Sequence, residues 1–139
     1  MRAYIDTSIL TGAYCVEPNS GRAQRALQNC EPVISSLTRL EFSSSVAKKL
    51  RTKTYKPAEA SLIISEFHSH IRAGIFEVAE LAGPQYALAN EWLDSFVTSL
   101  RTLDALHLAV AYSNRLKLVT SDVILAKAAK TLGVDVKRI

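Results

Sequence analysis

Near the start of the chain stands Ala3-Tyr4-Ile5-Asp6-Thr7-Ser8, in which a short apolar run passes directly into an acid and two hydroxyl residues. This pattern is typical of a buried strand that leads into a helix. It recurs at residues 32–36 (Pro-Val-Ile-Ser-Ser) and 116–122 (Leu-Lys-Leu-Val-Thr-Ser-Asp). Strands that alternate with helices indicate an α/β fold whose mostly parallel sheet is covered on both faces.

Outward from these strands, apolar spacing and helix-end signals predict the remaining elements. Pro57 and Gly74 stand where a helix typically begins and ends, and Thr38 with Glu41 fits a capping box. Beyond a helix that starts after Asp6, the predicted helices are 21–28, 37–51, 58–72, 85–100, 102–111 and 124–132, and the predicted strands are 3–5, 32–34, 75–78, 116–119 and 134–136. We therefore expect a three-layer α/β/α fold with a roughly five-stranded sheet.

Length and composition are those of one globular unit. The chain has 139 residues, of which 48% are hydrophobic and 22% charged, so we expect a single domain over residues 1–139 with no room for a second catalytic domain. No apolar run approaches the roughly 20 residues that span a bilayer, and the N-terminus does not resemble a signal peptide. We expect a soluble, cytoplasmic protein that does not enter membranes.

Cysteine content and net charge narrow the function little. Cys15 and Cys30 are expected to be reduced and buried, without a catalytic role. The formal net charge of +4 is compatible with a polyanionic partner but does not require one. The positions of the acids are more informative.

Four acids are predicted to gather at one edge of the sheet. Asp6 and Asp122 follow strands, Glu41 lies early in the helix after the second strand, and Asp104 lies in the first turn of the helix that precedes the fourth. Helices that follow parallel strands begin at the strands' carboxyl ends, where open α/β folds bind ligands. Three of the acids reach that edge by connectivity alone, and Asp104 reaches it if its helix packs there.

Each acid also has a simpler interpretation as a helix cap or as a partner of the helix dipole. Two features favour a joint role: Glu41 shares a stripe with Leu37, Leu40, Ser44 and Ala47, and Asp104 is the only charged residue between Arg101 and Arg115. Two buried carboxylates about 4 Å apart repel by about 4 kcal/mol at an effective dielectric near 20. A divalent cation would remove that repulsion.

Oxygen ligands without a cysteine or histidine set suit Mg²⁺ or Mn²⁺. Such ions activate water and neutralise the charge that builds on a phosphodiester under attack, so phosphoryl chemistry is the implied reaction. Four neighbouring hydroxyls would orient the carboxylates or touch a phosphate: Thr7, Ser8, Thr120 and Ser121.

The chain resembles the PIN-domain ribonucleases, specifically the VapC-type toxins of toxin–antitoxin pairs. The matching segments are 4–8 (Tyr-Ile-Asp-Thr-Ser), 39–42 (Arg-Leu-Glu-Phe), 101–109 (Arg-Thr-Leu-Asp-Ala-Leu-His-Leu-Ala) and 119–122 (Val-Thr-Ser-Asp), with the helix that runs on to Gly133. Their order spans almost the whole chain, and its length fits a stand-alone toxin. Residues 51–93 match nothing specific.

This resemblance implies a metal-dependent endoribonuclease that cuts structured RNA such as transfer or ribosomal RNA and is inhibited by a cognate antitoxin. The metal-binding acids would be Asp6, Glu41, Asp104 and Asp122, with Thr7 or Ser8 and Thr120 in support. Family members commonly form homodimers. The main alternative is a PIN-like module that binds RNA or a protein without cleavage; a receiver domain and a haloacid-dehalogenase-type phosphatase fit the acid spacing poorly.

Several further residues have open roles. The basic cluster of Lys48, Lys49 and Arg51, continued by Lys53 and Lys56, is either a solvated helix end or an RNA contact, and Arg101 is the better candidate for a phosphate contact. His68 and His70, two apart on a helix, are expected at the surface rather than on one metal. His107, one turn after Asp104, is either a core histidine or a group that supports the site.

Overall fold

The computed structural model describes residues 1–139 and contains seven helices and five strands. The strands are β1 (Arg2–Ile5), β2 (Glu31–Ser35), β3 (Glu77–Ala79), β4 (Lys117–Thr120) and β5 (Val136–Arg138). The helices are α1 (Thr7–Tyr14), α2 (Ser20–Gln28), α3 (Ser36–Arg51), α4 (Pro57–Arg72), α5 (Gly83–Asp94), α6 (Thr102–Ser113) and α7 (Val123–Thr131). No helix has both the length and the hydropathy needed to cross a membrane.

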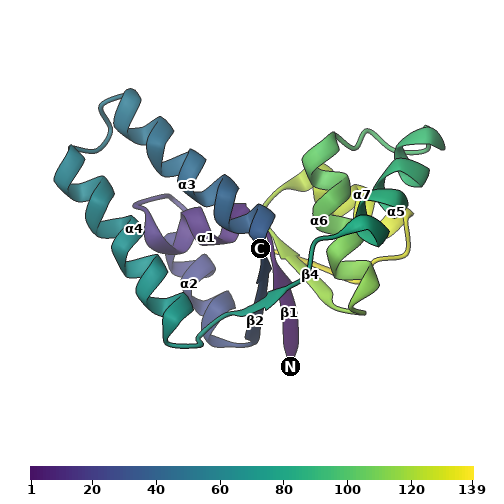
Figure 1. The fold of residues 1–139 in the computed structure, drawn as a ribbon, viewed down its shortest axis with the longest axis horizontal. Helices are drawn as coiled ribbons and strands as arrows, with labels where there is room; N and C mark the ends of the chain where they lie inside the picture. Colours follow the sequence, from purple (N-terminus) through teal and green to yellow (C-terminus); the bar gives the residue numbers. More distant parts are fainter.

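The five strands form one sheet in the order β3-β2-β1-β4-β5, and every neighbouring pair is parallel. In Figure 1, helices α1 to α4 lie on one side of the sheet and α5 to α7 on the other. The predicted α/β fold with a parallel five-stranded sheet is therefore confirmed.

Alternate residues of the central strands supply two separate cores. Ala3 and Ile5 of β1 pack with helices α1 to α4, whereas Tyr4 between them faces the opposite side, where α6 and α7 pack. This alternation follows from the two-residue period of a strand, and residues 3–5 of β1 are buried on both faces of the sheet. The first core also contains the clustered rings of Phe42 and Phe67, with centroids 4.5 Å apart.

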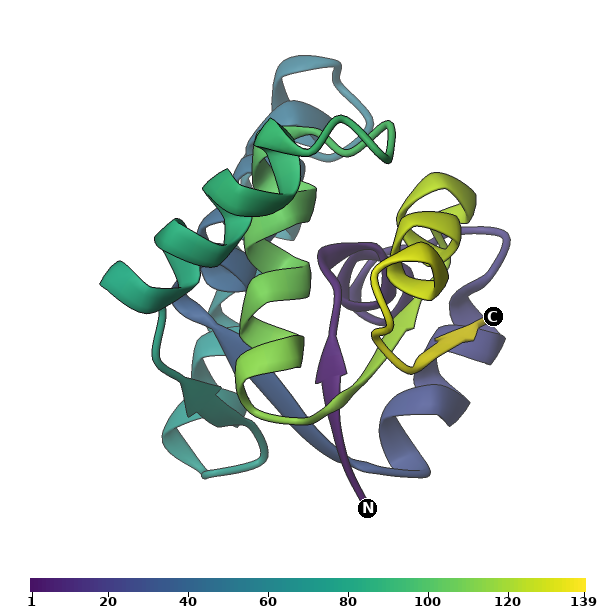
Figure 2. The ribbon, with the colours of Figure 1, turned by 90° about the vertical axis from the view of Figure 1, so that its right-hand side faces the viewer.

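The direction in which strands are added to the sheet reverses between β1 and β4. The chain first adds β2 and β3 on one side of β1, and then adds β4 and β5 on the other side. In an open parallel sheet, ligands bind beyond the carboxyl ends of the strands at such a reversal. Figure 2 views the face covered by α5, α6 and α7, with β1 running up through its centre. Asp6 and Asp122 follow the two strands that flank this point.

Two predicted strands begin two residues later than expected, for one shared reason. Gly74 and Gly133 end α4 and α7 in the left-handed region, with φ of 74° and 76°. The next residue, Ile75 or Val134, then donates its N–H back to the helix, to His70 O (3.1 Å) and Ala129 O (2.8 Å). These are Schellman ends, which use the first apolar residue to close the helix before a strand can start.

Helix α5 ends at Asp94, so the prediction of a helix to residue 100 is wrong. The hydroxyl of Ser95 donates to the carbonyl of Trp92, and Phe96 takes a positive φ of 54°. The following Val97 and Thr98 are β-branched and have low helix propensity. The chain therefore runs as an irregular segment, residues 95–101, up to the start of α6.

The predicted buried stripe of α3 is confirmed at Leu37 and wrong at its other apolar positions. Leu40 is 70% exposed, Ser44 and Ala47 are exposed, and the buried positions include Phe42 and Val46. The capping box consists of Ser35 and Thr38 rather than Thr38 and Glu41, because the helix begins at Ser36. Glu41 consequently has no capping role.

Both cysteines are free, as expected; Cys15 is buried and Cys30 is partly buried. Burial raises the pKa of both thiols. Thiols of this kind are poor nucleophiles at neutral pH, which agrees with a packing role.

Candidate active site

Asp6 lies at the junction of β1 and α1 and is 6% exposed. The hydroxyls of Ser8 and Thr120 donate to its Oδ2 over 2.6 and 2.8 Å, so β4 helps to hold an acid that follows β1. The backbone N–H of Ser8 donates to the same oxygen over 3.4 Å, so that Asp6 also caps α1. Oδ1 accepts no hydrogen bond within the chain and lies 3.8 Å from His107 Nε2.

Glu41 of α3 is partly buried and is held through Oε1 alone. Thr7 Oγ1 donates to this atom over 2.8 Å, and His107 Nε2 also contacts it. Burial raises the pKa of the Glu41 carboxyl, but the hydrogen bond and charge of His107, together with the bond from Thr7, outweigh burial and lower the pKa below its ordinary value. Glu41 is therefore ionised and oriented at neutral pH.

Asp122 is the exposed N-cap of α7, and Asp104 lies in the first turn of α6. Asp122 Oδ1 accepts the N–H groups of Ile124 and Leu125 over 2.8 and 3.1 Å, so its predicted capping role is present. Asp104 makes no side-chain hydrogen bond. Burial raises its pKa, and the nearby carboxylates of Asp122 and Asp6 raise it further.

The four acids share a simple pattern of free oxygens. Asp6, Glu41 and Asp122 are each held through one carboxylate oxygen, which leaves the second oxygen unbonded, and both oxygens of Asp104 are unbonded. The charges of the Asp122, Asp6 and Glu41 carboxylates all act to raise the pKa of Asp104. Hard oxygen donors whose negative charges repel one another fit a divalent cation such as Mg²⁺ or Mn²⁺.

As placed in the structure, no three acids, histidines or cysteines converge closely enough to hold one metal ion. The acids thus lie at the carboxyl edge of the sheet but do not form a complete set of metal ligands. Mg²⁺ keeps several water ligands and needs only one or two direct carboxylates, so this open arrangement fits such an ion.

The family model of the PIN domain matches residues 3–131. The chain belongs to the PIN domain family. This match covers more than nine tenths of the chain and includes all four acids, and it confirms the resemblance seen in the sequence segments around them. No curated protein matches the chain.

Solved structures with the same fold include several toxin–antitoxin proteins. The toxin VapC20 of Mycobacterium tuberculosis, described as cleaving the sarcin–ricin loop, is 17% identical with a TM-score of 0.70, and the match covers 91% of this chain and 94% of that one. VapBC2 of Rickettsia felis, bound to a promoter DNA fragment, is 18% identical with a TM-score of 0.71 over 99% and 98% of the two chains. A protein from Pyrobaculum aerophilum is 26% identical with a TM-score of 0.66 over 98% and 92%.

The supporting hydroxyls of this PIN domain divide between two acids. Ser8 and Thr120 contact Asp6, and Thr7 contacts Glu41. Ser121 contributes its backbone N–H, which donates to Ser8 Oγ over 3.0 Å, rather than its side chain. The structure thus links β1, α1 and β4 through one chain of hydroxyls.

The basic candidates lie in two different places. Arg101 is exposed at the N-cap of α6, three residues before Asp104. Lys49 forms an ion pair with Glu17 over 2.6 Å, and Lys48 and Arg51 are exposed at the far end of α3. Ten residues of helix separate Arg51 from Glu41, about 15 Å along the axis, so the cluster lies well away from the acids.

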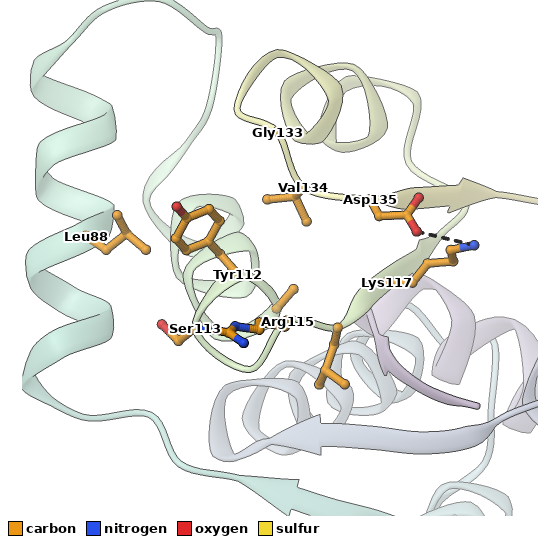
Figure 3. Close-up of a pocket in the computed structure, with 10 residues that line it drawn as sticks. Leu88, Tyr112, Ser113, Arg115, Lys117, Gly133, Val134 and Asp135 are labelled. Carbon is orange, nitrogen blue, oxygen red and sulfur yellow. Dashed lines mark ion pairs between the residues drawn. The ribbon is translucent and has the colours of Figure 1, made fainter.

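Two cavities of the PIN domain lie away from the acids. One, of about 620 Å³, includes Tyr112, Arg115, Lys117 and Asp135 at the amino ends of β4 and β5 (Figure 3). The other, of about 1020 Å³, lies beside α1, α2 and α4 and includes Tyr14 and His70. Neither cavity is lined by any of the four acids.

Sequence reasoning missed one part of the site. The sequence predicts only that Tyr4 lies in a strand, yet its hydroxyl contacts Ser35 Oγ (2.8 Å), Thr38 Oγ1 (3.1 Å) and His107 Nδ1 (2.8 Å). The only signal for this network in the sequence is that His107 follows Asp104 by one helical turn. His68 and His70 were expected at the surface but are each partly buried, and His70 Nδ1 hydrogen-bonds the hydroxyl of Tyr14.

Proposed function

We propose that this PIN domain is a metal-dependent endoribonuclease and the toxin of a type II toxin–antitoxin system. PIN domains as a family are nucleases. The observation that carries the proposal is the carboxyl-edge set of four acids, three of them oriented through one oxygen with the other oxygen free. Such preorganisation suits ligands that must hold a cation and a phosphate together.

The four acids would hold Mg²⁺ or Mn²⁺: Asp6, Glu41, Asp104 and Asp122. The bound ion would supply activation of water and neutralisation of charge on the scissile phosphate. Ser8 and Thr120 keep Asp6 in place, and Thr7 keeps Glu41 in place. Arg101, exposed three residues before Asp104, would contact a substrate phosphate.

RNA and an antitoxin are the proposed partners. The similar fold of VapC20, a toxin described as cleaving the sarcin–ricin loop, supports structured RNA, either ribosomal or transfer RNA, as the substrate. The similar folds of VapBC complexes from Rickettsia felis and Salmonella typhimurium support a cognate antitoxin. The family resemblance further supports a homodimer, in which acidic sites face a shared groove.

The direct test is cleavage of total RNA by the purified protein with Mg²⁺, with Mn²⁺ or with EDTA. We expect cleavage only with metal, and a loss of at least about 100-fold in Asp6→Asn and Asp104→Asn, at or above the upper end of the loss typical for residues that merely support metal ligands. Asp135→Asn is the matched control, because this exposed aspartate lies at the opposite end of the sheet and pairs with Lys117.

Cleavage that persists in EDTA, or in both active-site variants, would overturn the proposal. The alternative function, a module that binds RNA or a protein without cleavage, predicts intact RNA in every lane together with retained affinity. Sequencing of the cut ends after controlled expression then distinguishes ribosomal from transfer RNA as the target.

A further inference from the structure

His107 lies on α6, one turn beyond Asp104, and only 1% of it is exposed. Both ring nitrogens have partners. Nε2 contacts Glu41 Oε1 and lies 3.8 Å from Asp6 Oδ1, while Nδ1 is 2.8 Å from the Tyr4 hydroxyl. The ring therefore joins two candidate metal-binding acids to a polar group buried under the sheet edge.

The chemistry of these partners decides which nitrogen carries a proton. An ionised carboxylate only accepts hydrogen bonds, so Nε2 must donate an N–H to Glu41. Nδ1 can then either accept from the Tyr4 hydroxyl in the neutral ring or donate to it in the charged ring. In both forms Nε2–H faces Glu41, because the third form, with a proton on Nδ1 alone, would turn the Nε2 lone pair toward the carboxylate.

Tyr4 is itself firmly held. Its hydroxyl contacts Ser35 Oγ and Thr38 Oγ1, the two residues of the capping box that starts α3. Burial raises its pKa above the ordinary value, although the hydrogen bonds from Ser35 and Thr38 lower it, so the hydroxyl stays protonated. Since Glu41 lies on the same helix α3, one network fixes both the start of the helix and its acid.

We propose that His107 is a positioning residue, which orients the Glu41 carboxylate through Nε2–H, and that Tyr4 fixes the His107 ring through Nδ1. The proposal rests on the proposed function, because it treats Glu41 as one of the acids that bind the cation. The geometry explains why Glu41 Oε1 is occupied by protein donors and Oε2 is left free. A ligand held in this way loses less freedom when it binds a metal.

The first test is nitrogen-15 NMR of the histidine rings in the metal-free protein. We expect Nε2 of His107 to be protonated in the wild type, and the ring to be held less firmly in Tyr4→Phe, which lacks the partner of Nδ1. An unprotonated Nε2 in the wild type, with the proton on Nδ1, would overturn the proposal. This readout does not depend on cleavage activity.

The second test is Mn²⁺ affinity, measured by calorimetry, in two matched histidine variants. The amide nitrogen of Gln stands as far from Cβ as Nε2 does, whereas that of Asn corresponds to Nδ1. We expect His107→Asn to lose about 10- to 100-fold in affinity, the range typical of groups that orient metal ligands, and His107→Gln to recover most of it. Equal losses in the two variants would contradict the donor role.

A double-mutant cycle separates positioning from general stability. Tyr4→Phe is expected to lower Mn²⁺ affinity in the wild type but to have no further effect in Glu41→Gln, because Tyr4 acts only through that carboxylate. Leu108→Ala, a fully buried neighbour on α6, is the control; it is expected to lower the thermal stability and leave Mn²⁺ affinity unchanged. Equal losses for Tyr4→Phe in both backgrounds would show a merely structural role.

Failure of the two proposals gives different results. If the wild type binds Mn²⁺ and Asp6→Asn does not, while Tyr4→Phe and His107→Asn bind as the wild type does, the positioning role is refuted and the nuclease proposal stands. If the wild type neither binds Mn²⁺ nor cleaves RNA, the proposed function is refuted and the positioning role falls with it.

Discussion

Gly12 shows how closely two helices of this PIN domain approach. It is buried in α1, and a Cβ placed on it would lie 2.9 Å from Ala23 Cβ of α2 and 2.9 Å from Asn19 Oδ1. Real Cβ atoms do not approach this closely, so only glycine fits without a shift of α2. The same helix α1 carries Thr7 and Ser8 in its first turn, and its placement therefore bears on the site.

Substitution of this residue should destabilise the fold. We expect Gly12→Ala to lower the free energy of unfolding by about 1–3 kcal/mol, because overpacking forces the helices apart. Gly21→Ala is the control; its nearest contact would be 3.6 Å, and alanine should raise stability by up to about 1 kcal/mol through helix propensity. Urea unfolding of both variants measures the effect, and similar values for the two would contradict the close approach.

Helix α3 illustrates how a correct element can present the wrong face in a sequence-based prediction. The helix runs almost as predicted, but Leu37 is the one buried residue of the predicted stripe, and the other buried residues are Thr38, Phe42 and Val46. Periodicity detects a helix because apolar residues repeat every three or four positions. Where two apolar stripes are present, the neighbouring elements decide which one is covered.

The two faces of α3 should differ strongly in their contribution to stability. We expect Phe42→Ala to lower the free energy of unfolding by about 3–5 kcal/mol, since it opens a cavity among fully buried rings. Leu40→Ala should change it by no more than about 0.5 kcal/mol, as for other exposed positions. Chemical denaturation of the two variants in parallel tests this, and a large loss at Leu40 alone would refute the observed face.

At the scale of the molecule, charge is distributed unevenly. Of 13 acids, four gather at the carboxyl edge, which leaves nine acids against 17 basic residues over the rest of the chain. The acids that meet there come from both sides of the sheet, with Glu41 on α3 and Asp104 on α6. The fold therefore has an acidic site within a protein whose remaining residues are mainly basic. The repulsion among the carboxylates of that site lowers the stability of the fold when no cation is bound.

Asp104 is the acid whose charge is most opposed, since burial and its neighbours raise its pKa. Where an acid has a higher pKa in the folded state than in the unfolded state, the protein becomes less stable as the pH rises past the pKa of the unfolded state. At neutral pH in EDTA, we therefore expect Asp104→Asn to increase the free energy of unfolding by up to about 1 kcal/mol, after solvent screening.

The measurement is thermal and urea unfolding with EDTA and with Mn²⁺. Mn²⁺ should stabilise the wild type more than Asp104→Asn. The difference between their free energies of unfolding should therefore become smaller, or change sign, when the metal is present. A variant that is less stable than the wild type in EDTA would show that Asp104 has a favourable partner rather than repelling neighbours.

The sequence by itself determined the order of strands and helices, the parallel sheet and the candidate acids at its carboxyl edge. These follow from local patterns: apolar runs that end in polar residues, helix-end signals, and the rule that a helix after a parallel strand begins at that edge. The family match and the sheet order agree with this interpretation. The single domain, the metal and the roles of the acids stay predictions.

Only the tertiary structure decided which atoms meet. It showed that Glu41 pairs with Thr7 and His107 instead of capping α3, that residues 95–101 leave the helix, and that Tyr4 joins the site from within the sheet. Tyr4 and His107 are 103 residues apart, and nothing local in either segment encodes their contact. Local periodicity determines where a chain forms helices and strands, but the partner of a buried polar group depends on which elements pack around it.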